Sequence, residues 1–303
     1  MKFVCSTALI VLFHFSRIQR SFSFSVVCQN PFLRRQASTK TKGRTPAMAM
    51  ATDPTEDQLL VSLQDELDCN HKNKPRLVLA SQSPRRREIL TMMGLRENKE
   101  YFVEVSPLDE SKVQTELRSE GLSPTDYTRK LAEAKAHALA ETHYRNNGVG
   151  DDKDDHRVTY YLGSDTVVEI DGSILEKPTD ENDAKKMLNH LSGNQHRVHT
   201  GVALYRLERS DDGKNDDSTN GISLVDSFTD TAEVTFTNLT EEDIDAYIIS
   251  GEPMDKAGSY GIQGIGGQFV KEISGDFFAV MGLPMHSTSK LVAKALLAEP
   301  NNR

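Results

Sequence analysis

The sequence has no tryptophan, an aromatic content of only 7% and just three cysteines in 303 residues. Cys5 and Cys28 fall in an amino-terminal segment of unusual composition, so Cys69 stands alone in the rest of the chain. If this segment is removed, the single remaining cysteine excludes both a disulfide framework and a cysteine-based metal site within one chain.

The first 52 residues contain no aspartate or glutamate, although they hold eight lysines and arginines. They begin with the apolar run FVCSTALIVLFHF, which has the length of a signal peptide and is short for a membrane span. A Ser- and Arg-rich stretch typical of transit peptides follows. We therefore expect residues 1–52 to be a targeting segment for an organelle, a plastid or a mitochondrion. The alternative is a cytoplasmic enzyme that starts near Met48 or Met50.

The rest of the chain is acidic. Residues 53–303 hold 28 basic and 45 acidic residues, a balance of −17. This charge argues against a nucleic-acid-binding surface, and we expect no stable membrane span after the targeting segment.

Alternating strand and helix patterns follow a polar stretch, residues 53–75, that we interpret as a linker with one amphipathic part. Strands are predicted over residues 76–80, 101–105, 158–170, 196–207 and 224–236. Helices are predicted over residues 84–94, 124–142, 180–191, 240–250 and 284–298. The Asp171–Gly172 pair between short apolar runs predicts a hairpin. Interleaved strands and helices predict one α/β domain over residues 76–300, built on a mixed sheet.

Two charged, Gly- and Asn-containing segments, 145–157 and 208–221, interrupt this domain. Their acidic clusters lack the regular alternation of oxygen ligands and the closing glutamate of a calcium loop. We interpret both segments as solvated surface insertions.

The stretch LASQSPRRREIL places cations where a helix does not favour them. Ser83 is a candidate N-cap and Pro84 a candidate first helical residue, so three arginines follow in the first turn. The amide groups of a helix N-terminus attract anions. Arg85 and Arg86, with Ser81, would be explained by a multiply charged phosphate. The alternative is that the arginines simply point into water.

Other stretches hold polar residues that suit catalysis or binding. Asp165 lies in a long strand-like run, either beside a metal or water or as a turn residue at a strand end. Glu110, next to Asp109, faces either a cleft or solvent, and Lys135 is either at a cleft rim or exposed. In DKAGSYGIQGIGGQF five glycines permit close approach to a ligand, and Gln263 could bind a base edge. The alternative is an ordinary Gly-rich turn.

Taken together and in order, these motifs resemble those of the Maf family of nucleoside triphosphate pyrophosphatases. The matching stretches are LASQSPRRREIL, DES at 109–111, LAEAKA, LGSDTVV, ILEKP, LSGNQHRVHTGVAL, DKAGSYGIQGIGGQFV and GDFFAVMGLP. The resemblance covers most of residues 76–298. It implies an elongated α/β fold related to inosine triphosphatases, with a mixed sheet flanked by helices and a central nucleotide cleft. It also implies a homodimer.

The resemblance further implies a role for individual residues. Asp165 would be the general base, and Glu110 with Asp165 would hold a divalent metal, Mg²⁺ or Mn²⁺. The residues implied to hold the polyphosphate are Ser81, Arg85, Arg86, Lys135 and Lys177. Arg85, Thr166 and Gln263 stand where family subgroups differ, and they resemble the subgroup that acts on dTTP and UTP.

The function implied is therefore hydrolysis of dTTP or UTP, or of modified pyrimidine nucleotides, to the monophosphate and pyrophosphate. This would be a house-cleaning role. The alternatives are an inosine-type purine triphosphatase and a nucleotide-binding regulator without turnover.

Overall fold

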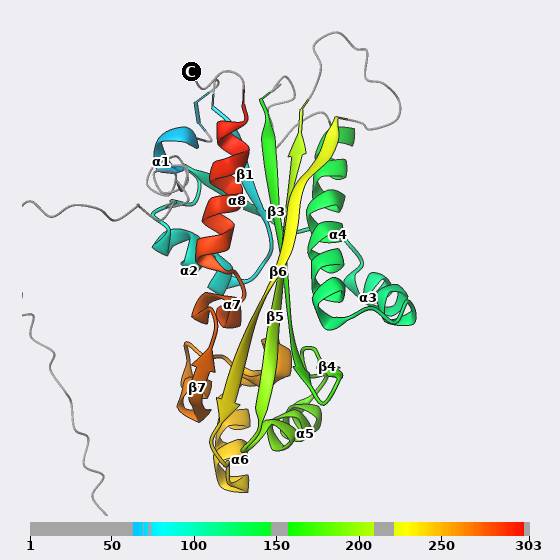
Figure 1. Cartoon of the computed structure of the whole chain (residues 1–303), viewed down its shortest axis with the longest axis vertical. Coiled ribbons are helices and arrows are strands. Elements are labelled where there is room, and N and C mark those ends of the chain that lie inside the picture. Colours follow the sequence, from blue (N-terminus) through cyan, green and yellow to red (C-terminus); the bar gives the residue numbers. More distant parts are fainter. Residues whose placement is uncertain (1–62, 69, 72–73, 147–156, 209–220, 300–303) are drawn as a thin grey trace, which may run out of the picture. The chain divides into compact units, whose positions relative to one another are not determined.

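The computed structural model describes residues 63–68, 70–71, 74–146, 157–208 and 221–299 (Figure 1). The expected targeting segment, 1–52, lies outside the described residues. So do nearly all residues of the two expected insertions, 145–157 and 208–221.

Within the described residues, seven strands form one mixed sheet in the order β2-β1-β3-β5-β6-β7, with β4 paired to β3. The strands are β1 (Arg76–Ala80), β2 (Tyr101–Glu104), β3 (Thr159–Ile170), β4 (Ser173–Leu175), β5 (Gln195–Leu207), β6 (Ile222–Phe236) and β7 (Val270–Ser274). β1 runs parallel to β2 and β3, whereas the other pairs are antiparallel. The predicted α/β fold with a mixed sheet flanked by helices is confirmed.

Helices cover both faces of this sheet (Figure 1). The α-helices are α1 (Leu63–Glu66), α2 (Pro84–Met92), α3 (Glu110–Ser119), α4 (Pro124–Arg145), α5 (Glu181–Leu191), α6 (Glu241–Ile249), α7 (Phe277–Met281) and α8 (Met285–Leu297). The short 3₁₀ helix η1 (Glu252–Asp255) leads into the Gly-rich segment, and two more, η2 (Ala257–Ser259) and η3 (Ile265–Phe269), lie in it.

Strand β1 shows how the two layers form. Leu77 and Leu79 pack into the core that contains α8, whereas Val78 and Ala80 pack into the core that contains α4. Successive side chains of a strand point to opposite faces, so a strand covered on both sides must be apolar throughout. This explains the uninterrupted apolar run LVLA, residues 77–80, which the structure buries completely.

Two glycines bring α4 close to the sheet. A Cβ atom on Gly201 of β5 would lie 2.4 Å from the backbone of Thr128, and one on Gly163 of β3 would lie 2.2 Å from the carbonyl oxygen of Ala132. Any larger residue would push the helix away. This close approach places Lys135, one turn further along α4, against β3.

The folded part begins earlier than Arg76. Leu63 and Leu67, within the segment expected to be a linker, are buried in the core near α8. The described end of the amphipathic part, residues 63–67, therefore packs on the domain through these two leucines.

Most predicted elements occur at their expected positions, including the hairpin at Asp171 (φ 50°) and Gly172 (φ 75°) between β3 and β4. Helices α3 and α7 and strand β7 were not predicted. Among the described residues, no helix has the length and apolar character of a membrane span.

We expect Gly201→Ala to lower the free energy of unfolding by about 1–3 kcal/mol, because the added methyl group overlaps the α4 backbone. Thermal or denaturant unfolding measures this change. Ser223→Ala, on the exposed part of β6, is the control and should leave stability unchanged. Equal stability of Gly201→Ala and the parent chain would show that α4 tolerates displacement.

Candidate active site

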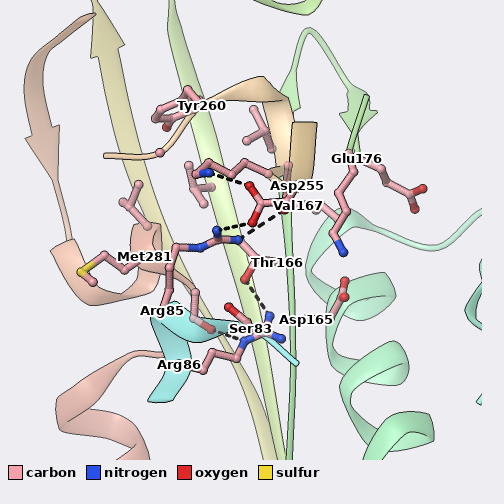
Figure 2. Close-up of a pocket in the computed structure, with 18 of the residues that line it drawn as sticks. Ser83, Arg85, Arg86, Asp165, Thr166, Val167, Glu176, Asp255, Tyr260 and Met281 are labelled. Atoms are coloured by element: carbon pink, nitrogen blue, oxygen red, sulfur yellow. Dashed lines mark hydrogen bonds and ion pairs between the residues drawn. The ribbon is translucent and has the colours of Figure 1, made fainter. Parts of the chain in front are cut away.

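A pocket of about 300 Å³ opens between the start of α2, the middle of β3, the end of β4 and the Gly-rich segment (Figure 2). Eight residues proposed from the sequence line it: Arg85, Arg86, Glu110, Lys135, Asp165, Thr166, Lys177 and Gln263. The ninth, Ser81, does not line the pocket, but its Oγ accepts a hydrogen bond from Arg86. Residues as far apart in sequence as Arg85 and Gln263 therefore meet in one place.

The first turn of α2 directs two of its three arginines to the pocket. Arg86 donates to the carbonyl oxygen of Gly282 (2.8 Å), to Ser81 Oγ (2.9 Å) and to Thr166 Oγ1 (3.4 Å). Desolvation lowers the pKa of Arg86 to about 10, although the charge of Asp165 opposes this shift. The guanidinium is therefore still charged at neutral pH. Arg87 points away and pairs with Glu97 at 2.7 Å.

Ser83 and Pro84 begin α2 as predicted, but the Ser83 side chain forms no capping hydrogen bond. The Ser83 amide instead donates to Ser81 Oγ at 3.2 Å. The free amides and the two inward arginines together form the anion-favouring end of the pocket. The alternative, in which the arginines simply point into water, does not hold for Arg85 and Arg86, and the half-exposed Arg87 is paired with Glu97.

A buried lysine joins the two carboxylates proposed for catalysis. Lys135 Nζ lies 2.8 Å from Asp165 Oδ1 and 2.9 Å from Glu110 Oε2. Lys135 is only 6% exposed, so it is neither a rim group nor a surface residue. Because a buried charge requires partners, the three side chains stabilise one another's position.

Asp165 is not a turn residue at a strand end. β3 continues from Thr159 to Ile170 without interruption, and Asp165 pairs in register with Gly201 of β5 near its centre. The apparent break at Gly163 and Ser164 is instead the place where α4 packs. Asp165 is 9% exposed, and its carboxylate faces the pocket (Figure 2).

The opposite side of the pocket is more open. Lys177 and Gln263 are exposed, and Lys177 has no ion-pair partner among the described residues. Thr166 accepts from Arg86 and shares a 2.9 Å hydrogen bond with Thr200. A ligand between the arginines and these groups would meet polar atoms on both sides.

Two acidic residues of this pocket were not proposed as site residues from the sequence. Asp255 Oδ2 accepts from Arg85 at 3.1 Å, and its other oxygen pairs with Lys256. Burial raises the pKa of Asp255, but Lys256 and Arg85 outweigh it, so the pKa is lowered overall. Glu176 is held by Arg118 at 2.7 Å and by the Tyr127 hydroxyl. Asp255 lies in the stretch DKAGSYGIQGIGGQFV and Glu176 in ILEKP. These two motifs were the sequence signal from which both acids could have been proposed as site residues.

His196 and His199 lie outside the lining of this pocket. His196 shares a 2.9 Å hydrogen bond with the Tyr260 hydroxyl, and burial lowers its pKa to about 4. His199 bonds to Thr231 at 2.9 Å. Spacing by three in β5 sends the two rings to opposite faces, so they form no joint site.

Comparison with known proteins identifies the family. A family model described as Maf-like protein matches residues 76–295, which include every proposed site residue. The chain belongs to the Maf-like family.

Curated relatives of this Maf-like chain are named dTTP/UTP pyrophosphatase. One from Shewanella denitrificans is 42% identical over 219 residues, covering 71% of this chain and 94% of its own length. One from Colwellia psychrerythraea is 39% identical over 236 residues, covering 78% of this chain and 96% of its own length. A third, from Bacillus cereus, is 42% identical over 214 residues, with 71% and 87% covered.

We expect Asp255→Asn in this Maf-like chain to tighten the binding of inorganic pyrophosphate about two- to fivefold, because Arg85 loses a competing anion. Calorimetric titration at low ionic strength measures the effect, which added salt should reduce. Glu242→Gln makes the same change of charge on the exposed start of α6 and is the control. Weaker binding in Asp255→Asn would mean that Asp255 orients Arg85 instead of competing for it.

Proposed function

We propose that this Maf-like chain hydrolyses dTTP and UTP to the monophosphate and pyrophosphate. The observation that supports this most directly is that the arginines of α2 and the carboxylate of Asp165 line one pocket of nucleotide-binding size. The names of the curated relatives support the substrate class.

The basic residues would bind the triphosphate. A nucleoside triphosphate brings about four negative charges at neutral pH, which suits a set of guanidinium and ammonium groups. Arg85, Arg86 and Lys177 line the pocket from two sides, and Ser81 holds Arg86 in place. In this proposal Arg85 exchanges its bond to Asp255 for one to phosphate.

Asp165 would take the proton of the attacking water. The water oxygen forms a bond to the α-phosphorus, the bond from that phosphorus to the bridging oxygen breaks, and pyrophosphate leaves. Lys135 orients the carboxylate through its 2.8 Å contact, and the rigid centre of β3 fixes its backbone. Such positioning is a large part of catalysis of phosphoryl transfer.

The donor set fits a divalent metal of the Mg²⁺ or Mn²⁺ type. These ions prefer carboxylate oxygens and commonly bind through one or two carboxylates plus substrate phosphates. Glu110 and Asp165 supply two such groups, and no cluster of three or more ligating side chains occurs among the described residues. When bound, the metal would screen the charge of the phosphate oxygens.

Thr166 and Gln263 would face the nucleoside end of the substrate. The Gln263 amide has both a donor and an acceptor, as a pyrimidine edge requires. An inosine-type purine triphosphatase is the competing enzyme activity, and a panel of nucleotides separates the two. A regulator without turnover is disfavoured because binding alone would not require the buried Lys135 to hold the carboxylates of Asp165 and Glu110 together.

We expect Asp165→Asn to lower kcat for dTTP and UTP about 10²–10⁴-fold, since it removes the proton acceptor while keeping the side-chain shape. Separate assays of pyrophosphate and orthophosphate measure the product. Unchanged binding of a non-hydrolysable dTTP analogue is the control for folding. Full activity of the variant, or release of orthophosphate by the parent enzyme, would refute the proposed reaction.

We expect Glu110→Gln to raise the Mn²⁺ concentration for half-saturation about tenfold or more in the presence of a non-hydrolysable nucleotide. Electron paramagnetic resonance of free Mn²⁺ measures binding without relying on turnover. Glu116→Gln, exposed on the same helix, is the matched control. Equal Mn²⁺ affinity of Glu110→Gln and the parent would exclude Glu110 as a ligand.

Three further expectations accompany this proposal. A house-cleaning role would appear as accumulation of modified pyrimidine nucleotides when the gene is removed.

Organellar import, with a cytoplasmic location as the alternative, rests on the composition of residues 1–52, and a reporter fused to residues 1–75 tests it. A homodimer follows from the family resemblance, and sedimentation measures it.

A further inference from the structure

The Gly-rich segment that presents Gln263 is held by one carboxylate. Glu252 Oε2 accepts from the amide of Ile265 at 2.9 Å, and Oε1 accepts from the amide of Gly266 at 3.1 Å. Both amides lie just after Gln263. Glu252 itself is the first residue of η1, on the preceding part of the chain.

A tyrosine extends this anchor to the other side of Gln263. The Tyr247 hydroxyl donates to Glu252 Oε1 at 2.9 Å and accepts from the amide of Gly261 at 3.1 Å. Tyr247 is 2% exposed, and its ring packs edge-on against Phe269. Three backbone amides on both sides of Gln263 therefore depend on one pair of side chains.

Two glycines of this segment make room for the side chains of Glu252 and Tyr247. A Cβ atom on Gly264 would lie 2.5 Å from both carboxylate oxygens of Glu252, and one on Gly266 would lie 2.5 Å from the Tyr247 hydroxyl. Such distances leave no room for a side chain. Glycine is needed here because the backbone must approach the carboxylate closely.

The carboxylate keeps its charge in this setting. Partial burial raises the pKa of Glu252, but hydrogen bonds from Ile265, Gly266 and Tyr247 outweigh it, so the pKa is lowered. Charged acceptors form stronger hydrogen bonds to amides than neutral ones. The Glu252 carboxylate and the Tyr247 hydroxyl thus hold the backbone that carries the exposed side chain of Gln263.

We propose that Glu252 is a positioning residue for substrate selection, which acts through Gln263 by fixing the backbone on both sides of it. The inference rests on the proposed function, in which Gln263 contacts the base. Preorganisation matters because a base-contacting side chain on a loose loop loses part of its binding energy to ordering.

The test compares Glu252→Gln, Gln263→Ala and the double variant. We expect Glu252→Gln to lower the preference for dTTP over dGTP, taken as the ratio of kcat/KM values, by about tenfold. The loss should come from KM for dTTP, with kcat within about threefold of the parent. In the Gln263→Ala background, Glu252→Gln should cause no further loss of preference.

Two additional variants separate positioning from general stability. Gly264→Ala displaces the carboxylate without changing it and should reproduce the loss of preference. Glu272→Gln, an exposed carboxylate on β7, should leave preference and KM unchanged. If Glu252→Gln does not fold, Tyr247→Phe decides the question, because it keeps the ring and removes only the bridging hydroxyl.

The outcomes distinguish the two levels of the proposal. Equal loss of kcat for every nucleotide, or additive effects of Glu252→Gln and Gln263→Ala on preference, would overturn the positioning role and leave the proposed function intact. A parent enzyme without pyrimidine preference, or unchanged preference in Gln263→Ala, would overturn the proposed base contact and the inference together.

Discussion

The contact of one buried ammonium group with two carboxylates organises this site. Lys135 is nearly inaccessible to solvent, and it lies within 2.9 Å of both Asp165 and Glu110. A lysine is stable in such a place only if anions surround it, and the buried carboxylate of Asp165 likewise requires a cation, whereas Glu110 reaches Lys135 from a half-exposed position. The three residues come from α4, β3 and α3, so their charges constrain how these elements pack. The close approach of α4 at Gly163 and Gly201 makes the contact possible.

Two parts of the pocket with different backbone structure surround this centre. The start of α2 and the middle of β3 hold the charged groups on rigid backbone, where the positions of phosphate and water would matter most. The Gly-rich segment after η1 has little regular structure of its own, and its Gln263 side chain is exposed. The carboxylate of Glu252 accepts hydrogen bonds from two backbone amides of this segment, Ile265 and Gly266.

Most charged groups of the pocket are paired with a group of opposite charge. Arg85 faces Asp255, Glu176 faces Arg118, and Lys135 has its two acids. This balance keeps the pocket stable before a ligand arrives, because unpaired charges of one sign would repel one another. In the proposed function, a polyphosphate would compete with Asp255 for Arg85, and its affinity would depend on ionic strength as well as on shape.

The sequence by itself determined most elements, because the apolar periodicity of β1, β3, β5 and α4 is strong and local. The SPRRR stretch left two interpretations open, an anion site or arginines that point into water. The sequence also determined the family, through motifs in a fixed order. Only the tertiary structure decided that Lys135 is buried, that Asp165 lies in the middle of a strand and that Glu252 supports Gln263. These facts depend on which elements pack together, and a glycine that admits a neighbouring backbone looks, in sequence alone, like a glycine in a turn.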